Sequence, residues 1–201
     1  MGFLSGSASF MRFSVEGELP DSFWEFVAER VAGHSFRDID DSLDEYSIGW
    51  VSVASMFDAD FAYGSYAAGD YVVLSMRVDE RKVSPAVLKK CVLKEEERIK
   101  RERQIPRLNR SALLEIKERI RTELVRKSVP IPAVYDLAWN LSDGTLYFFS
   151  TSKKALVLLE ELFKETFGLS LILQIPWNTA LHIADETDWQ RLDNLRPEIL
   201  L

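Results

Sequence analysis

The basic side chains between Arg81 and Lys127 are the residues of this sequence whose types and spacing indicate a chemistry most directly. This segment holds 16 of the 25 Lys and Arg residues but only 7 of the 32 Asp and Glu residues, so its formal charge is +9. The rest of the chain carries −16, within a net charge of −7. Such a separation of charge exceeds what solubility requires, and it predicts a polyanion as the partner.

Part of this charge forms a line at helical spacing. Four basic residues follow one another at intervals of four, four and three positions, which places them on one side of a helix: Lys90, Lys94, Arg98 and Arg101. Side chains about 6 Å apart along a helix can follow a phosphate backbone. No aromatic residue occurs in this segment, which disfavours base stacking on single strands and favours contact with a duplex backbone. The candidate DNA-binding residues are Lys89, Lys90, Lys94, Arg98, Lys100, Arg101, Arg103, Lys117 and Arg121.

An alternative interpretation needs no DNA. Glutamates lie three or four residues from these basic side chains, which is also typical of a solvated helix with internal ion pairs. The basic helix could then dock on an acidic partner surface, such as residues 37–45 of another copy, and the protein would be a module for protein interaction or self-assembly. The glutamates concerned are Glu95, Glu96, Glu97 and Glu102.

Residues that could carry catalysis are sparse. Neither His34 nor His182 lies in an HxxxH, HxH or HxxE spacing, so an ordinary role is expected for each rather than that of a metal ligand. Cys91 lies within the expected basic helix beside Val87 and Leu88, where a buried small apolar residue is expected rather than a nucleophile. No glycine-rich phosphate-binding motif is present. The sequence therefore predicts a protein that is not an enzyme and has no cofactor.

An acidic run could in principle bind a divalent cation, but it lacks the ligand order and central glycine of a calcium-binding loop. A metal-dependent nuclease is consequently the weakest of the three hypotheses, and a solvated loop that could face a partner is the expectation. The run consists of Asp38, Asp40, Asp41, Asp44 and Glu45.

The overall composition sets the remaining bounds. The chain has 201 residues, of which 47% are hydrophobic, enough for a single domain with a real core. The single cysteine excludes an internal disulfide and is typical of a reducing cytoplasm. No apolar run has the length of a signal peptide core or a membrane span, so neither a leader nor a membrane partner is expected.

The pattern of apolar residues predicts strands and helices in a mixed order. Period-two alternation and β-branched residues predict strands over 10–15, 48–53, 70–78, 134–141, 145–150 and 169–175. Helical periodicity and capping residues predict helices over about 22–33, 84–103, 111–127, 152–168 and 186–195. Together they predict one α+β domain over 1–201, with a largely antiparallel sheet and helices on one face. The basic segment 81–127 would be a helical insertion in it, and 178–201 a C-terminal tail.

In several short motifs, taken in order, the chain resembles the bacterial RdgC family of recombination-associated DNA-binding proteins. None of these motifs is catalytic, and their order and spacing over about 10–177 carry the resemblance. The motifs are Met11-Arg-Phe13, Ile48-Gly-Trp-Val51, 72–77, the run Arg81-Lys-Val-Ser-Pro-Ala-Val-Leu-Lys-Lys90, Ala138-Trp139 with Asp143-Gly144-Thr-Leu146, and Ser152-Lys-Lys-Ala155.

This resemblance implies binding of double-stranded DNA without sequence preference, by a homodimer that closes into a ring around the duplex. It also implies a nucleoid-associated protein in the cytoplasm that limits access of the strand-exchange recombinase to DNA. Family members carry a further C-terminal region, so the chain resembles a short member. The loop 126–132 also lacks the phenylalanine that the family commonly places at a dimer contact, so the resemblance does not define how this chain would form a dimer.

Overall fold

A curled antiparallel sheet of seven strands forms the centre of the protein. The computed structural model describes residues 2–4, 9–61, 64–185, 188–189, 191 and 194. The strands lie in the order β2-β4-β5-β6-β1-β7, with the short β3 also paired to β4. Their bounds are β1 (Met11–Glu16), β2 (Tyr46–Val51), β3 (Ala67–Ala68), β4 (Tyr71–Arg81), β5 (Pro130–Asn140), β6 (Thr145–Phe148) and β7 (Ser170–Leu173).

Two helices, α1 (Phe23–Gly33) and α4 (Lys153–Phe167), cover one face of this sheet. Alternate residues of β4 turn toward them, so Val72, Leu74 and Met76 are buried in the main hydrophobic core. Helix α4 begins where the Ser152 side chain accepts a hydrogen bond from the Ala155 amide, and ends at Gly168 with a positive φ of 71°. The α+β fold with helices on one face is therefore confirmed.

The other face of β4 contains charged and polar side chains that are also buried. Ser75, Arg77, Asp79 and Arg81 alternate along this face, under the segments that follow α1 and β2. The predicted end of the strand at Val78 is wrong, because β4 continues to Arg81. Charged residues in a sequence normally indicate exposure to solvent, but the charged side chains of β4 have their hydrogen-bond partners within the protein. Arg81 is thus the buried end of a strand and not part of the basic helical segment.

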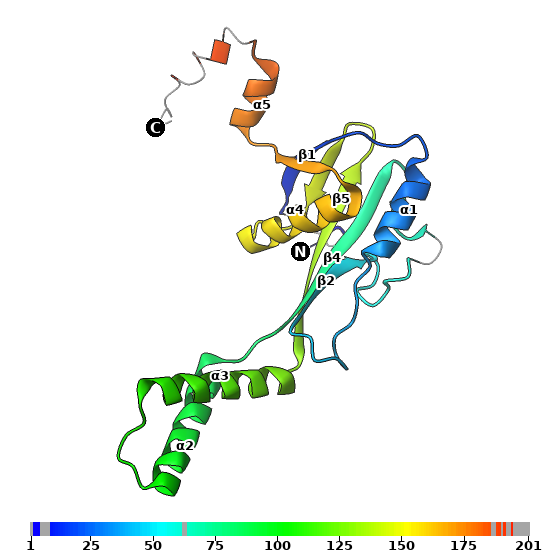
Figure 1. Ribbon diagram of the computed structural model, residues 1–201. Helices are drawn as coiled ribbons and strands as arrows, with labels where there is room; N and C mark the ends of the chain where they lie inside the picture. Colours follow the sequence, from blue (N-terminus) through cyan, green and yellow to red (C-terminus); the bar gives the residue numbers. More distant parts are fainter. Residues whose placement is uncertain are drawn as a thin grey trace.

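Helices α2 (Pro85–Arg103) and α3 (Arg110–Lys127) project from the end of the sheet on the long strands β4 and β5, as Figure 1 shows. They pack chiefly on each other and form a helical hairpin with its own small core. At the other end of the molecule lies α5 (Pro176–Ile183), which the sequence did not predict. The helix expected over 186–195 falls largely outside the described residues.

Pro130 and Pro132 begin β5 rather than lying in a loop between the second helix and a strand expected at 134. The register of β6 with β5 covers Leu137–Trp139, and within the described residues no strand pairs with this edge of β5 before Asp136, so we call that part the open edge. The Phe149 amide donates to the Asp136 carbonyl, which shows that even-numbered residues of β5 turn their backbone groups toward this edge. The two prolines therefore remove N–H donors from the open edge, a common protection against pairing with other chains.

Gly49 in β2 is required by a close backbone crossing. A Cβ atom at this position would lie 2.5 Å from Phe36 Cα and 2.6 Å from Phe36 N. Residues 34–36 are held against β2 by two backbone hydrogen bonds of 2.9 Å. The Phe36 amide donates to the Trp50 carbonyl, and the Trp50 amide donates to the His34 carbonyl.

We expect Gly49→Ala to lower the free energy of unfolding by about 2–3 kcal/mol, because backbone atoms cannot rotate away as a side chain can. Urea denaturation would measure the change. Gly33→Ala is the matched control, because nothing lies within 4 Å of its Cβ position, and it should change stability by less than about 1 kcal/mol. Equal effects of the two substitutions would contradict the crossing.

Candidate nucleic-acid interface

The helical hairpin owes its shape to short capping signals and a narrow apolar seam. Helix α2 begins with Pro85 at its first turn and ends at Gln104, which adopts a positive φ of 52°. Helix α3 begins at Asn109, whose side chain accepts a 2.8 Å hydrogen bond from the Ala112 amide. The seam is formed by Leu108, Ile116 and Ile120, with Leu88, Cys91, Val92, Ile99, Ile105, Ala112, Leu113 and Leu124 packed against them. Cys91 packs against this seam but is only half-buried, less than the buried position expected from the sequence.

The structure places all nine candidate DNA-binding residues on this hairpin. Eight are exposed, and Lys100 is partly covered, with 31% of its side chain accessible. They do not form one surface, because the apolar seam divides the hairpin into two sides. We call them the groove side and the basic side, and they differ in how far acidic residues neutralise the positive charge.

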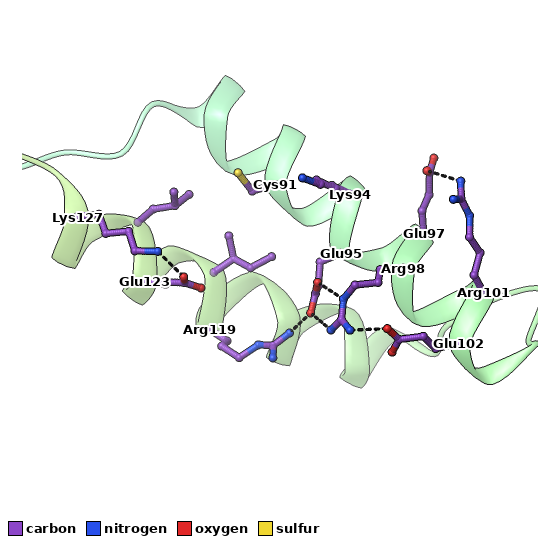
Figure 2. A pocket seen from close by; sticks show the side chains of 12 residues that line it. Cys91, Lys94, Glu95, Glu97, Arg98, Arg101, Glu102, Arg119, Glu123 and Lys127 are labelled. Atoms are coloured by element: carbon purple, nitrogen blue, oxygen red, sulfur yellow. Dashed lines mark hydrogen bonds and ion pairs between the residues drawn. The ribbon is translucent and has the colours of Figure 1, made fainter.

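The groove side contains a network of ion pairs between the two helices. Arg98 donates to both oxygens of Glu95, each at 2.8 Å, and to Glu102 at 2.6 Å. Arg119 from α3 reaches the same Glu95 carboxylate, as Figure 2 shows. The hydrogen bonds from Arg98, followed by those from Arg119, lower the pKa of Glu95 to about 2, against its partial desolvation. A groove of about 680 Å³ runs beside this network.

The predicted stripe on α2 is therefore only partly available to an anion. Arg98 is held in the network just described, and Arg101 lies 3.6 Å from Glu97, on the part of α2 turned away from α3 in Figure 2. Lys90 and Lys94 make no ion pair with any residue that the structure describes. The regular spacing is real, but half of the stripe has internal partners.

The basic side brings together lysines and arginines from both helices. Lys89 of α2 and Lys117 of α3 line the same small pocket of about 360 Å³, whose other walls are Pro85, Leu88, Val92 and Leu93. The helical period places further basic residues on this side: Lys100 and Arg103 in α2, and Arg110 and Arg121 in α3.

Among these six residues, only Lys100 is paired within the described chain, with Glu96 at 2.6 Å. Sequence reasoning missed this meeting of the two helices, because it depends on which faces of α2 and α3 pack together. The apolar seam at Ile116 and Ile120 was the available signal, since Lys117 and Arg121 each follow a seam residue directly.

Arg81 connects the end of the hairpin where α3 meets β5 to the body of the protein. Its guanidinium donates to the carbonyls of Asp44 at 3.0 Å, Ile39 at 2.7 Å and Asp40 at 3.1 Å, and also to those of Ser42 and Ser128. Ser128 directly follows α3, whereas the other four carbonyls belong to the acidic loop. The buried arginine thus connects the end of the hairpin to that loop.

The acidic loop is held to the body of the protein by its backbone, whereas its five acidic side chains are exposed. Its backbone carbonyls point inward to Arg81, and Asp38 lies 3.7 Å from Arg77. Within the described residues, no group of three or more His, Cys, Asp or Glu side chains could hold a metal ion. His34 ends α1, where its ring Nδ1 lies 2.9 Å from the Arg30 carbonyl.

Comparisons with known proteins add no further assignment. No protein-family model matches the chain, and no curated protein does either. The resemblance to the RdgC family therefore stays a prediction that depends on the order of short motifs. In the described part of the chain, no helix is both long and apolar enough to cross a membrane.

Proposed function

We propose that this protein binds double-stranded DNA without sequence preference, and that the basic side of the helical hairpin makes the main contacts. The observation that carries the proposal is the meeting of unpaired basic residues from two helices on one exposed surface. Five of its six lysines and arginines have no acidic partner in the described chain. Phosphate oxygens can pair with such side chains without breaking an existing ion pair.

The placement of this surface suits a polyanion. The body of the protein carries the negative charge, whereas the hairpin projects away from it on β4 and β5 (Figure 1). Screening limits the repulsion from the body to about 8 Å at physiological salt. A phosphate backbone along the hairpin would thus meet mainly positive potential. The absence of aromatic residues in the hairpin favours contact with a duplex rather than stacked single strands.

The test is a salt series with the whole chain and a labelled duplex of random sequence, followed by fluorescence anisotropy. If all six basic residues contact phosphates, the logarithm of the binding constant should fall with the logarithm of salt concentration with a slope of about −5. Duplexes of different sequence should bind alike, and a single strand should bind more weakly. Absence of binding at low salt, or binding that salt leaves unchanged, would refute the proposal.

The proposal includes no catalytic step. Duplex incubated with the protein and magnesium or manganese should therefore stay intact, and cleavage products would revive the nuclease hypothesis. The association with recombination, including competition with the strand-exchange recombinase, is proposed from the family resemblance alone. It depends on DNA binding being observed first.

A further inference from the structure

The basic side of the hairpin has an apolar centre. The pocket between Lys89 and Lys117 has walls of proline, leucine and valine side chains. Leu93, one of these walls, is 50% exposed, and Leu114, which helical spacing places beside Lys117, is 53% exposed. Contacts between lysines and phosphate groups leave these apolar side chains unused. The pocket is therefore suited to a ligand that combines a large apolar side chain with negative charge.

The acidic loop, residues 37–45, carries that combination. Leu43 is 71% exposed, and four acidic residues but no basic residue lie within three positions of it. Among the exposed large apolar residues of the described chain, no other has four acidic residues so near in sequence. The four carboxylates are exposed and make no ion pair with any residue that the structure describes. They belong to Asp40, Asp41, Asp44 and Glu45.

The fold presents the side chains of this loop to the outside. The backbone carbonyls of Ile39, Asp40, Ser42 and Asp44 accept hydrogen bonds from the buried Arg81 guanidinium. The backbone of the loop therefore faces the protein, whereas its leucine and carboxylates face outward. Because the backbone is already held, docking of this loop costs less conformational entropy than the ordering of a free segment would.

We propose that the acidic loop of one copy docks on the basic side of the hairpin of a second copy, with Leu43 in the pocket and its neighbouring carboxylates against Lys89 and Lys117. The apolar and charged groups of the two surfaces are then complementary. In Figure 1 the loop, drawn in blue between α1 and β2, lies toward the hairpin, so both surfaces are at the same end of the molecule. Two copies that exchange them make the contact twice, which favours a two-fold dimer over an open chain.

Reciprocal docking predicts a dimer whose amount rises with protein concentration and falls with salt. Sedimentation velocity of the whole chain over a concentration series would measure it. We expect Leu43→Ser to weaken the dimer by about tenfold or more, because each dimer loses the buried leucine twice. Leu4→Ser is the matched control, because Leu4 is 69% exposed but follows Phe3, whose amide donates to Asp136 of β5. Equal weakening by the two substitutions would contradict docking of the acidic loop.

A charge exchange identifies the two partners directly. Lys89→Glu combined with Lys117→Glu should weaken the dimer, and so should Asp41→Lys combined with Asp44→Lys. An equal mixture of the two double variants should restore it, because the altered hairpin then meets the altered loop. A chain that stays monomeric up to about 1 mM would overturn the proposal, and so would a mixture that fails to restore the dimer.

These outcomes are separate from those for DNA binding, although the acidic loop and the duplex would share the basic side. Leu43→Ser should preserve or increase affinity for the duplex, since it weakens a competitor for the same lysines. A loss of duplex affinity in this variant would contradict competition for a common surface. A wild-type chain that forms the dimer but binds no duplex at low salt would refute the proposed function and leave this inference standing.

Discussion

Asp79→Asn is expected to lower the free energy of unfolding by about 3–5 kcal/mol, because it removes the only buried counter-charge of a buried arginine among the described residues and leaves it the exposed Asp38 at 3.7 Å. Asp79 is only 1% exposed, and both of its carboxylate oxygens accept hydrogen bonds from Arg77, at 2.9 Å and 2.7 Å. The side chain of Arg77 is 6% exposed and packs 4.2 Å above the centre of the Phe36 ring. The hydrogen bonds to Asp79 are also the main cause of the raised pKa of Arg77, against its desolvation.

Chemical denaturation would test this expectation, with the midpoint shifted and the denaturant dependence unchanged. Glu80→Gln is the control, because Glu80 lies on the same strand and pairs with Lys154 at the surface, where an ion pair contributes about 0–1 kcal/mol. The combined substitution of Arg77→Met and Asp79→Leu should retain more stability than Asp79→Asn alone, since no unpaired charge remains. A loss below about 1 kcal/mol for Asp79→Asn would contradict a buried ion pair.

This same pair explains where sequence reasoning about the fold succeeded and where it failed. Strands and helices with one apolar face were predicted well, because burial on one side imposes a period of two or 3.6. The end of β4 was missed because Arg77, Asp79 and Arg81 look like solvent-exposed residues. Their spacing of two was the available signal, since it places opposite charges on the same face of a strand. The partners that make burial tolerable for Arg81 are backbone carbonyls, which no pattern of side chains reveals.

The helical hairpin shows a similar division. Ser84-Pro85 predicted the start of α2 correctly, because this signal acts within a few residues of the chain. For α3 the sequence offered Asn109 or Ser111 as the cap, and in the structure Asn109 takes this place. The four basic residues predicted to follow one side of a helix do lie within α2. The ion pairs of Arg98 and Arg101 with glutamates are local to α2, at the spacing of three and four residues that the sequence shows. In contrast, the pairing of Arg119 with Glu95 across the two helices and the meeting of Lys89 with Lys117 depend on tertiary packing. The sequence therefore identified the charged segment but not its more basic side.

Lys89→Gln combined with Lys117→Gln is expected to weaken duplex binding by about tenfold or more and to reduce the salt slope by about two. Both lysines are exposed, line the same pocket and have no acidic partner in the described chain. The loss should be the same for duplexes of different sequence, because contacts to the backbone carry no base information. Anisotropy titrations at several salt concentrations would give both quantities.

Arg98→Gln combined with Arg101→Gln is the matched control, because it removes the same formal charge from the same helical hairpin. Arg98 and Arg101 already pair with Glu95, Glu102 and Glu97, so their contacts with phosphate would require those ion pairs to break. If the hairpin attracts the duplex only through its long-range field, both double variants should lose the same affinity. If the basic side contacts phosphates directly, the lysine variant should lose more. If the arginine variant loses as much affinity as the lysine variant, the basic side is not the contact surface, and the charge of the hairpin acts as a whole.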